Sequence, residues 1–233
     1  MTTTYTGEVA AGGPSQLRVL DRVEIRKACV GAMGNNAYLV TCRRTGHQLL
    51  VDAAADSDRL VALVREGSGS ARLDIIVTTH SHPDHHGALE DLVGVTGALT
   101  TAGVEDVPQI PVLTRRPLRD GDTILVGDVA LAVVALRGHT PGSLALVHTE
   151  PDDARAEGAV PGRSHIFTGD SLFPGGVGST RGDRTRFDQL LGDVTARIFE
   201  RYRDDTWIYP GHGADTTLGA ERPHLTQWRE RGW

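Results

Sequence analysis

Residues 79–87 read Thr-His-Ser-His-Pro-Asp-His-His-Gly and place four metal-binding side chains, His80, His82, Asp84 and His85, within six positions. They follow residues 73–78, an apolar and β-branched segment that predicts a buried strand. His80 and His82 are two positions apart and point the same way in extended chain. The proline at position 83 suits a first helical turn, so Asp84 and His85 can face a second point. The loop could therefore offer ligands to two neighbouring metal ions. The alternative is a solvated polar turn, which rarely gathers so many ligand side chains.

Two metal ions need more than four protein ligands, and three further candidates occur downstream. Each follows a predicted strand and is flanked by glycine or proline, as expected where the backbone turns sharply beside a packed site. The candidates are His139 in Gly-His-Thr-Pro-Gly at 138–142, Asp170 in Gly-Asp-Ser at 169–171, and His212 in Pro-Gly-His-Gly at 210–213.

Taken in order, H-x-H-x-D-H, G-H-T-P-G, T-G-D and P-G-H-G resemble the signature of the metallo-β-lactamase superfamily. The match is dense from about residue 70 to 222 and looser before it, where residues 34–40 and 49–52 fit the family's opening hairpin. Phe-Pro-Gly-Gly-Val-Gly-Ser-Thr at 173–180 and the stretch 210–222 resemble the short, single-domain glyoxalase II-like hydrolases.

The resemblance implies an α/β fold, the four-layer αββα metallo-β-lactamase sandwich. It also implies two divalent metal ions at one edge between the sheets. The first would be held by His80, His82 and His139, the second by Asp84, His85 and His212, with Asp170 bridging both. A donor set of imidazole and carboxylate without thiolate suits Zn²⁺, and Fe or Mn remain alternatives.

The function that the resemblance implies is hydrolysis of a thioester, or of a related ester, by a metal-bridging hydroxide. Asp84 and Asp170 would be the catalytic carboxylates. One alternative is a persulfide dioxygenase, which uses a single iron bound by two histidines and an aspartate, and others are lactonase and β-lactamase activity. The longer glyoxalase II enzymes carry a helical domain that binds glutathione, whereas this chain is expected to end in one short helix, which leaves the thiol of the substrate open.

The glycine-rich loop after Asp170 is the expected substrate-binding segment, through Phe173, Gly175, Gly176 and Ser179. Its backbone N–H groups could cradle a substrate, and its place next to a metal ligand favours this role. Phe173 and Tyr38 could wall the pocket or belong to the core. Asp52 either holds the ligand loop, as its counterpart does in the resembling family, or merely caps a strand.

Five histidines remain outside the ligand set. His86 lies next to the last ligand of the loop and is expected to support the site or to be solvated. The other four are expected to be ordinary surface residues: His47, His148, His165 and His224.

Composition narrows the class of protein further. The chain has 233 residues and a formal charge of −6, with no basic stripe that would favour nucleic acid as a partner. No apolar run approaches about 18 residues, so we expect no membrane span. We expect the substrate to be a small molecule. The protein could be a monomer or a homodimer.

The expected organisation is a flexible tail over 1–16, without the features of a signal peptide, and a single domain over 17–233. Cys29 and Cys42 are expected to be buried free thiols in a reducing cytoplasm, although a disulfide between them is conceivable. Strands are predicted near 17–25, 37–41, 47–52, 73–78, 98–101, 122–126, 129–136, 143–148, 165–168 and 207–209. Helices are predicted near 57–66, 85–93, 102–107, 186–202 and 220–229.

Overall fold

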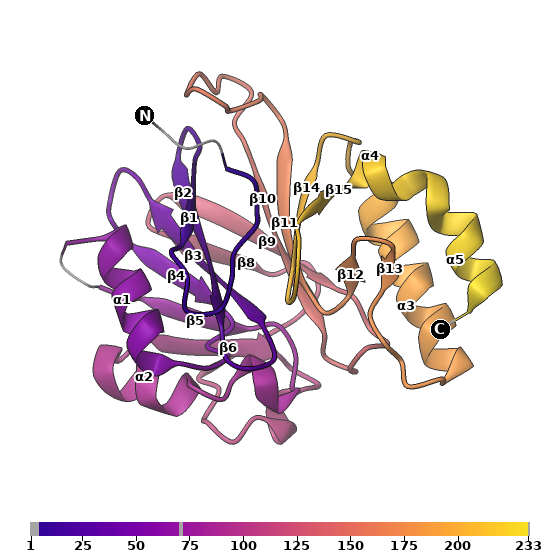
Figure 1. Ribbon diagram of the computed structural model, residues 1–233, viewed down its shortest axis with the longest axis horizontal. Coiled ribbons are helices and arrows are strands. Elements are labelled where there is room, and N and C mark those ends of the chain that lie inside the picture. Colours follow the sequence, from indigo (N-terminus) through magenta and orange to yellow (C-terminus); the bar gives the residue numbers. More distant parts are fainter. Residues whose placement is uncertain (1–4, 70–71, 233) are drawn as a thin grey trace.

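Two β-sheets pack face to face, and helices cover the outer face of each sheet (Figure 1). A computed structural model describes residues 5–69 and 72–232. Three apolar clusters separate the four layers. One fills the space between the sheets, and each of the other two lies between a sheet and its helices. The predicted αββα sandwich is therefore confirmed.

The first sheet holds the first seven strands in the order of the sequence. They are β1 (Gln16–Val19), β2 (Val23–Val30), β3 (Asn35–Cys42), β4 (Gln48–Val51), β5 (Ile75–Thr78), β6 (Leu99–Gly103) and β7 (Arg116–Leu118). Strands β1 to β4 are antiparallel to their neighbours, and β4 to β7 run parallel. Helices α1 (Ser57–Gly67) and α2 (Leu89–Thr96) make the parallel connections possible, because each returns the chain to the start of the next strand.

The second sheet has the strand order β15-β14-β11-β10-β9-β8. Its strands are β8 (Thr123–Val126), β9 (Val129–Ala135), β10 (Leu144–Thr149), β11 (Ser164–Gly169), β14 (Trp207–Pro210) and β15 (Thr216–Thr217). A small hairpin, β12 (Leu172–Phe173) and β13 (Gly176–Val177), follows β11. The helices on the outer face are α3 (Arg184–Val194), which continues into a π-helical turn at Thr195–Phe199, α4 (Leu218–Glu221) and α5 (Leu225–Arg231). Among the described helices, none has the length and apolarity needed to cross a membrane.

Aromatic rings close the central core near one end of the sheets. Tyr38 from the first sheet and Phe167 and Tyr209 from the second have ring centroids 4.8 to 5.4 Å apart. The Tyr38 side chain is only 1% exposed and its hydroxyl donates to the carbonyl of Pro210 at 2.7 Å. Of its two sequence-based interpretations, Tyr38 therefore belongs to the core and does not wall a pocket.

The two sheets meet where the ligand loops emerge. The backbones of Asn35 and His212 form an isolated antiparallel bridge between the sheets. The amide of Asn36 donates to Gly211 at 2.7 Å, and the amide of Leu144 donates to Thr79 at 3.0 Å. These backbone bonds join the start of β3 to the loop after β14, and the start of β10 to the residue after β5.

Some predicted elements differ from the structure. The segment 17–25 is not one strand, because the chain turns between β1 and β2. The helix predicted near 102–107 is wrong. Residues 102–103 end β6, and a turn at 104–106 leads into a short 3₁₀-helix at Val107–Gln109. His148 and His165 are buried, at 4% and 0% exposure, because both faces of β10 and β11 are covered. The prediction that they lie on the surface is therefore wrong. Cys29 and Cys42 are buried and free, as predicted.

The N-terminal segment makes specific contacts from Tyr5 onward, whereas residues 1–4 of the predicted flexible tail lie outside the described residues. The Tyr5 hydroxyl donates to Asp215 at 2.6 Å, and its ring packs edge-on against Trp207. Farther along, Ala11 forms a parallel bridge with Cys29. The described part of this segment is thus docked on the domain.

The anchor of this segment is the ion pair of Lys27 and Asp215, whose side chains are both fully buried. The Lys27 ammonium donates to the Asp215 carboxylate at 2.7 Å, to the carbonyl of Gly7 at 2.6 Å and to that of Gly213 at 2.8 Å. All three of its donors are therefore used, which is what a buried ammonium requires. The pair joins the N-terminal segment, the first sheet and the loop that carries His212.

We expect Asp215→Asn to destabilise the protein strongly, because it leaves a buried ammonium without its counter-charge. The loss in the free energy of unfolding should be about 3–5 kcal/mol, measured by urea denaturation. The control is Asp188→Asn, which breaks the exposed pair of Asp188 with Arg184 and should change stability by less than about 1 kcal/mol. Similar losses in the two variants would contradict this account of the buried pair.

Candidate metal centre

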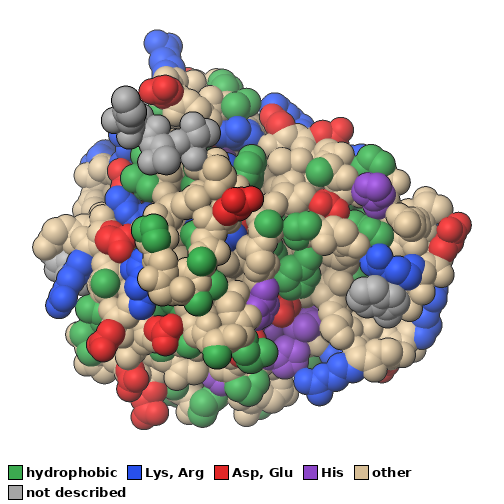
Figure 2. Space-filling view, viewed as in Figure 1, with side chains coloured by type: hydrophobic (Ala, Val, Ile, Leu, Met, Phe, Trp, Pro, Cys, Tyr) green, Lys and Arg blue, Asp and Glu red, His purple; other side chains and the backbone are tan. Residues whose placement is uncertain are grey.

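Seven side chains from four loops converge at the shared edge of the two sheets. They form three overlapping groups, in each of which the candidate ligand atoms lie within 4.8 Å of one another: His80, His82 and His139; His80, His85 and Asp170; and Asp84, His85 and His212. Figure 2 shows histidine side chains gathered at one place on the face that it draws. The structure thus brings together all seven ligands that the sequence predicts.

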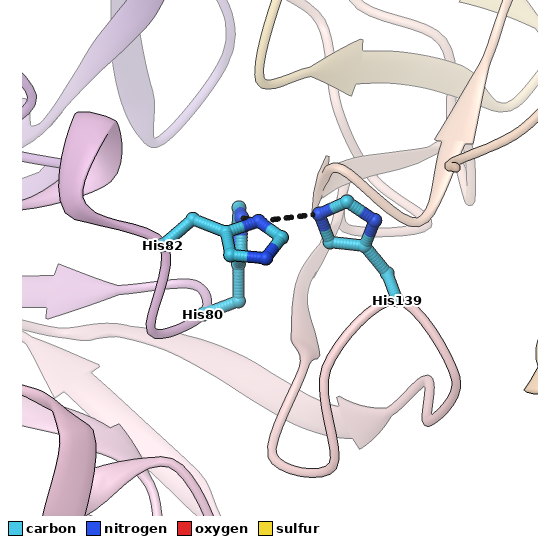
Figure 3. A group of neighbouring side chains, drawn as sticks. All are labelled: His80, His82 and His139. Atoms are coloured by element: carbon cyan, nitrogen blue, oxygen red, sulfur yellow. Dashed lines mark hydrogen bonds between the residues drawn. The ribbon is translucent and has the colours of Figure 1, made fainter. Parts of the chain in front are cut away.

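The three-histidine group is His80, His82 and His139, which come from two different loops (Figure 3). Nδ1 of His82 lies 3.1 Å from Nε2 of His80 and 2.9 Å from Nε2 of His139. Nitrogen ligands of a tetrahedral zinc ion, with bonds of about 2.0–2.1 Å, are roughly 3.3 Å apart. The three nitrogens are therefore spaced nearly as they would be around one ion.

Hydrogen bonds on the far side of two rings keep the ligand nitrogens free. Nδ1 of His139 donates to the carbonyl of Ser179 at 2.8 Å, and Nδ1 of His80 donates to the hydroxyl of Thr79 at 3.1 Å. With Nδ1 protonated, Nε2 of each neutral ring presents a lone pair.

The surroundings also keep these rings neutral. Burial lowers the pKa of His80 well below its ordinary value, and the neighbouring His85 and His139 lower it further. Burial likewise lowers the pKa of His139. The pKa of His82 is lowered by burial and then by the positive charge of Arg181. A metal ion therefore does not have to compete with protons for these nitrogens near neutral pH.

The mixed group is Asp84, His85 and His212. Oδ2 of Asp84 lies 3.5 Å from Nε2 of His85 and 3.4 Å from Nε2 of His212. The side-chain amide of Asn35 donates to the same oxygen at 3.0 Å. The sequence analysis did not identify Asn35 as a site residue, because its partner is 49 positions away. Asn35 starts β3 and lies opposite His212, a neighbourhood that arises only when the two sheets pack together.

The second position favours a positive charge. Burial lowers the pKa of His85, but the carboxylates of Asp52 and Asp170 outweigh burial and raise that pKa to about 10. A bound cation would supply the same positive charge that the proton supplies here, and metal binding would release the proton. The donor set of this group therefore fits a divalent ion.

Asp170 lies between the two groups. Its Oδ1 is 3.4 Å from Nε2 of His85, and its Oδ2 is 3.7 Å from Nε2 of both His139 and His212. Within the described part of the chain, Oδ1 is buried and accepts no hydrogen bond. A buried carboxylate oxygen without a donor is costly unless a cation binds it. This orphaned oxygen is the observation that fits a metal best.

Asp52 holds the ligand loop from behind. Its carboxylate accepts hydrogen bonds from the amide of Thr79 at 2.7 Å, the hydroxyl of Thr79 at 2.8 Å and Nδ1 of His85 at 2.8 Å. The residue has a left-handed backbone, with φ 60°, which aspartate tolerates better than most residues. Of the two interpretations from the sequence, support of the ligand loop is therefore the one that the contacts favour.

The predicted substrate loop contributes to the centre in a way that the sequence did not reveal. Ser179 is exposed, and its carbonyl binds His139. The amide of Gly175 donates to Glu221 at 2.8 Å and is not free to bind a substrate. Gly176 is buried and Phe173 is half-buried in the hairpin. Substrate binding by these four residues remains a prediction.

His86 supports the loop and is not among the groups that could hold a metal. Its Nε2 donates to the carbonyl of Ser81 at 3.2 Å, and its side chain is buried. The supporting role therefore holds, and the solvated alternative does not.

Comparisons with known proteins agree with this centre. The family model of the metallo-β-lactamase superfamily matches residues 30–212. The chain is 32% identical to the probable hydroxyacylglutathione hydrolase glo2 of Schizosaccharomyces pombe, over 78% of this chain and 65% of that protein. It therefore spans less than two thirds of the relative's length.

Two solved structures are similar in both fold and sequence. ETHE1 from Myxococcus xanthus has a TM-score of 0.71 and 26% identity, covering 88% of this chain and 84% of its own. The protein TTHA1623, solved in a di-iron-bound form, has a TM-score of 0.64 and 28% identity, covering 83% of this chain and 95% of its own.

We expect two metal ions per chain, because both groups are complete and Asp170 faces each of them. Elemental analysis of protein loaded with zinc and then desalted should approach two equivalents. A firm value near one equivalent, with Asp84, His85 and His212 free in a structure of the loaded protein, would rule out the dinuclear centre.

Gly211→Ala should abolish binding at the mixed group. A Cβ atom at this position would lie 2.3 Å from Oδ1 of Asp170 and 2.7 Å from Cε1 of His85, so both side chains would have to move. Metal content should fall from two equivalents to about one while the circular dichroism spectrum stays that of the wild type. The matched control is Gly192→Ala on α3, where a Cβ atom meets nothing within 4 Å. This control should keep its metals and gain up to about 1 kcal/mol of stability.

Proposed function

Since this chain belongs to the metallo-β-lactamase superfamily, we propose that it is a dinuclear metal-dependent hydrolase that cleaves a thioester, as glyoxalase II enzymes do. The observation that carries the proposal is the placement of Asp170 between two complete ligand groups, with one carboxylate oxygen buried and without a hydrogen bond in the described residues. The similarity to a probable hydroxyacylglutathione hydrolase supports the choice of thioester.

The protein would hold one ion with His80, His82 and His139 and the other with Asp84, His85 and His212, and Asp170 would contact both. Bound there, the ions would lower the pKa of water from 15.7 to about 7 and polarise a carbonyl oxygen. Two carboxylates do not neutralise two divalent ions, so the site stays cationic where negative charge develops on the substrate.

The leaving group is constrained because three of the ring N–H groups at the site are already used. The Nδ1–H groups of His80, His85 and His139 each bind an oxygen of the protein. They are therefore not available to protonate a departing atom. A thiolate leaves without a proton because the thiol pKa is low, whereas an amide nitrogen does not. This difference favours a thioester over an amide substrate.

The alternative of nucleophilic catalysis by a side chain finds no support at this site. Ser81 lies within the ligand loop, but its hydroxyl donates to Oε1 of Gln109 at 2.9 Å and not to a histidine. A serine that lacks a neighbouring base is a weak nucleophile. Water is thus the nucleophile that the arrangement suits.

The second candidate is a persulfide dioxygenase with one iron ion, and the likeness to ETHE1 from Myxococcus xanthus favours it. We rank it below the hydrolase because persulfide dioxygenases have an arginine-rich loop after the aspartate, whereas residues 171–176 of this chain read Ser-Leu-Phe-Pro-Gly-Gly. We also propose that the protein works in a reducing compartment such as the cytoplasm, since it has two free thiols.

The function is tested with a panel of thioesters and lactones, using the zinc-loaded protein. We expect hydrolysis of at least one thioester, and we expect Asp170→Ala to reduce kcat by about a hundredfold or more while weakening metal binding. The exposed variant Asp188→Ala serves as the control and should keep its activity. Oxygen uptake with a persulfide by the iron-loaded protein, without thioester turnover, would replace the hydrolase by the dioxygenase.

A further inference from the structure

Asp106 is a buried carboxylate that joins the two loops of the three-histidine group. It follows β6 and is fully buried. Its Oδ2 accepts hydrogen bonds from the amide of Ser81 at 2.8 Å and from the hydroxyl of Thr140 at 2.6 Å. Its Oδ1 accepts one from the amide of Gly142 at 2.7 Å. Ser81 lies between His80 and His82, and Thr140 follows His139 directly.

These contacts are not explained by local helix capping. Asp106 stands at the N-cap position of the 3₁₀-helix Val107–Gln109, where an aspartate often binds the first amides of the helix. Here the side chain makes no capping bond. Within the described residues, the hydrogen bonds of its carboxylate all go to the two ligand loops, 25 to 36 positions away along the chain.

The backbone of the His139 loop packs directly against Asp106, with no room for a side chain at the contact. A Cβ atom on Gly142 would lie 2.5 Å from the amide nitrogen of Asp106 and 2.7 Å from its Cγ. A Cβ atom on Gly103 would lie 2.0 Å from the carbonyl oxygen of Gly142. Both positions therefore require glycine, and the geometry of the junction leaves little freedom for either loop to shift.

We propose that Asp106 is a positioning residue for the metal ion of the three-histidine group, which it serves by locking the His80–His82 loop to the His139 loop. The inference rests on the proposed metal-dependent function. The Asp106 carboxylate accepts three hydrogen bonds, and hydrogen bonds to a carboxylate are stronger than those to a neutral acceptor. Asp52 holds His85 of the mixed group through a hydrogen bond to Nδ1. The three-histidine group and the mixed group are thus each supported by a buried carboxylate.

The test is Asp106→Asn in the background of His212→Ala, where only the three-histidine group keeps a complete set of its own ligands. Asparagine has the same shape, but one of its two side-chain positions is an NH₂ donor. In either orientation that donor faces an amide that also donates, so one loop loses its anchor. We expect the zinc dissociation constant, measured by competition with a chromophoric chelator, to rise about 10- to 100-fold.

The matched control is Glu150→Gln in the same background. Glu150 is also a buried carboxylate that holds a loop, through the amide of Val160 and the side chains of Arg163 and His165, but it lies outside the ligand groups. Both variants should lower the melting temperature of the metal-free protein. Only Asp106→Asn should change the zinc dissociation constant.

A milder variant covers the case in which Asp106→Asn does not fold. Thr140→Val removes one of the three donors and should raise the zinc dissociation constant about fivefold. Unchanged zinc affinity in both Asp106→Asn and Thr140→Val, or an equal change in Glu150→Gln, would overturn the inference. If zinc affinity falls as expected in the variants but the zinc-loaded wild type hydrolyses no thioester, the positioning role stands and the proposed substrate class fails. A wild type that binds no zinc, iron or manganese overturns both.

Discussion

The site depends on one constraint, which is that the ligand lone pairs of His80, His85 and His139 must be held in place by hydrogen bonds on the opposite side of each ring. Imidazole rings can rotate and can carry their proton on either nitrogen. In this protein oxygen acceptors settle both choices: Thr79 for His80, Asp52 for His85 and the carbonyl of Ser179 for His139. Because Thr79 and Asp52 are buried in the packed framework, the positions of His80 and His85 follow from the packing of the domain.

The same constraint explains why charged groups are buried in a domain with an aliphatic core. Asp52 and Asp106 each accept hydrogen bonds from the ligand loops, and these bonds compensate for the loss of water around the two buried carboxylates. Lys27 and Asp215 pair with each other. Lys27 also donates to the carbonyls of Gly7 and Gly213, and Asp215 also accepts from Tyr5 and Trp207. Buried carboxylates and one ammonium thus surround the centre.

Much of the fold and all seven candidate ligands could be predicted from the sequence. Four ligands lie in one short loop after an apolar strand, and each of the other three follows a predicted strand and stands beside glycine or proline. The supporting residues could not be predicted, since their partners are distant along the chain: Asn35 and Asp84 are 49 positions apart, and Asp106 and Thr140 are 34 apart. His165 looked like a surface residue because local pattern does not show that both faces of its strand are covered. Its partner Glu150 directly follows the neighbouring strand β10, and the Glu150 carboxylate hydrogen-bonds to Nε2 of His165 in the interior.

The order of strands within the sheets has a consequence for how the protein is made. Each sheet is built from one continuous half of the chain, residues 16–118 for the first and 123–217 for the second. The first half supplies His80, His82, Asp84 and His85, and the second supplies His139, Asp170 and His212. Neither metal position is complete until the two halves have docked. In the proposed dinuclear hydrolase, acquisition of the metals would therefore follow the docking of the two halves, and a chain that stalls halfway through synthesis could not assemble the centre.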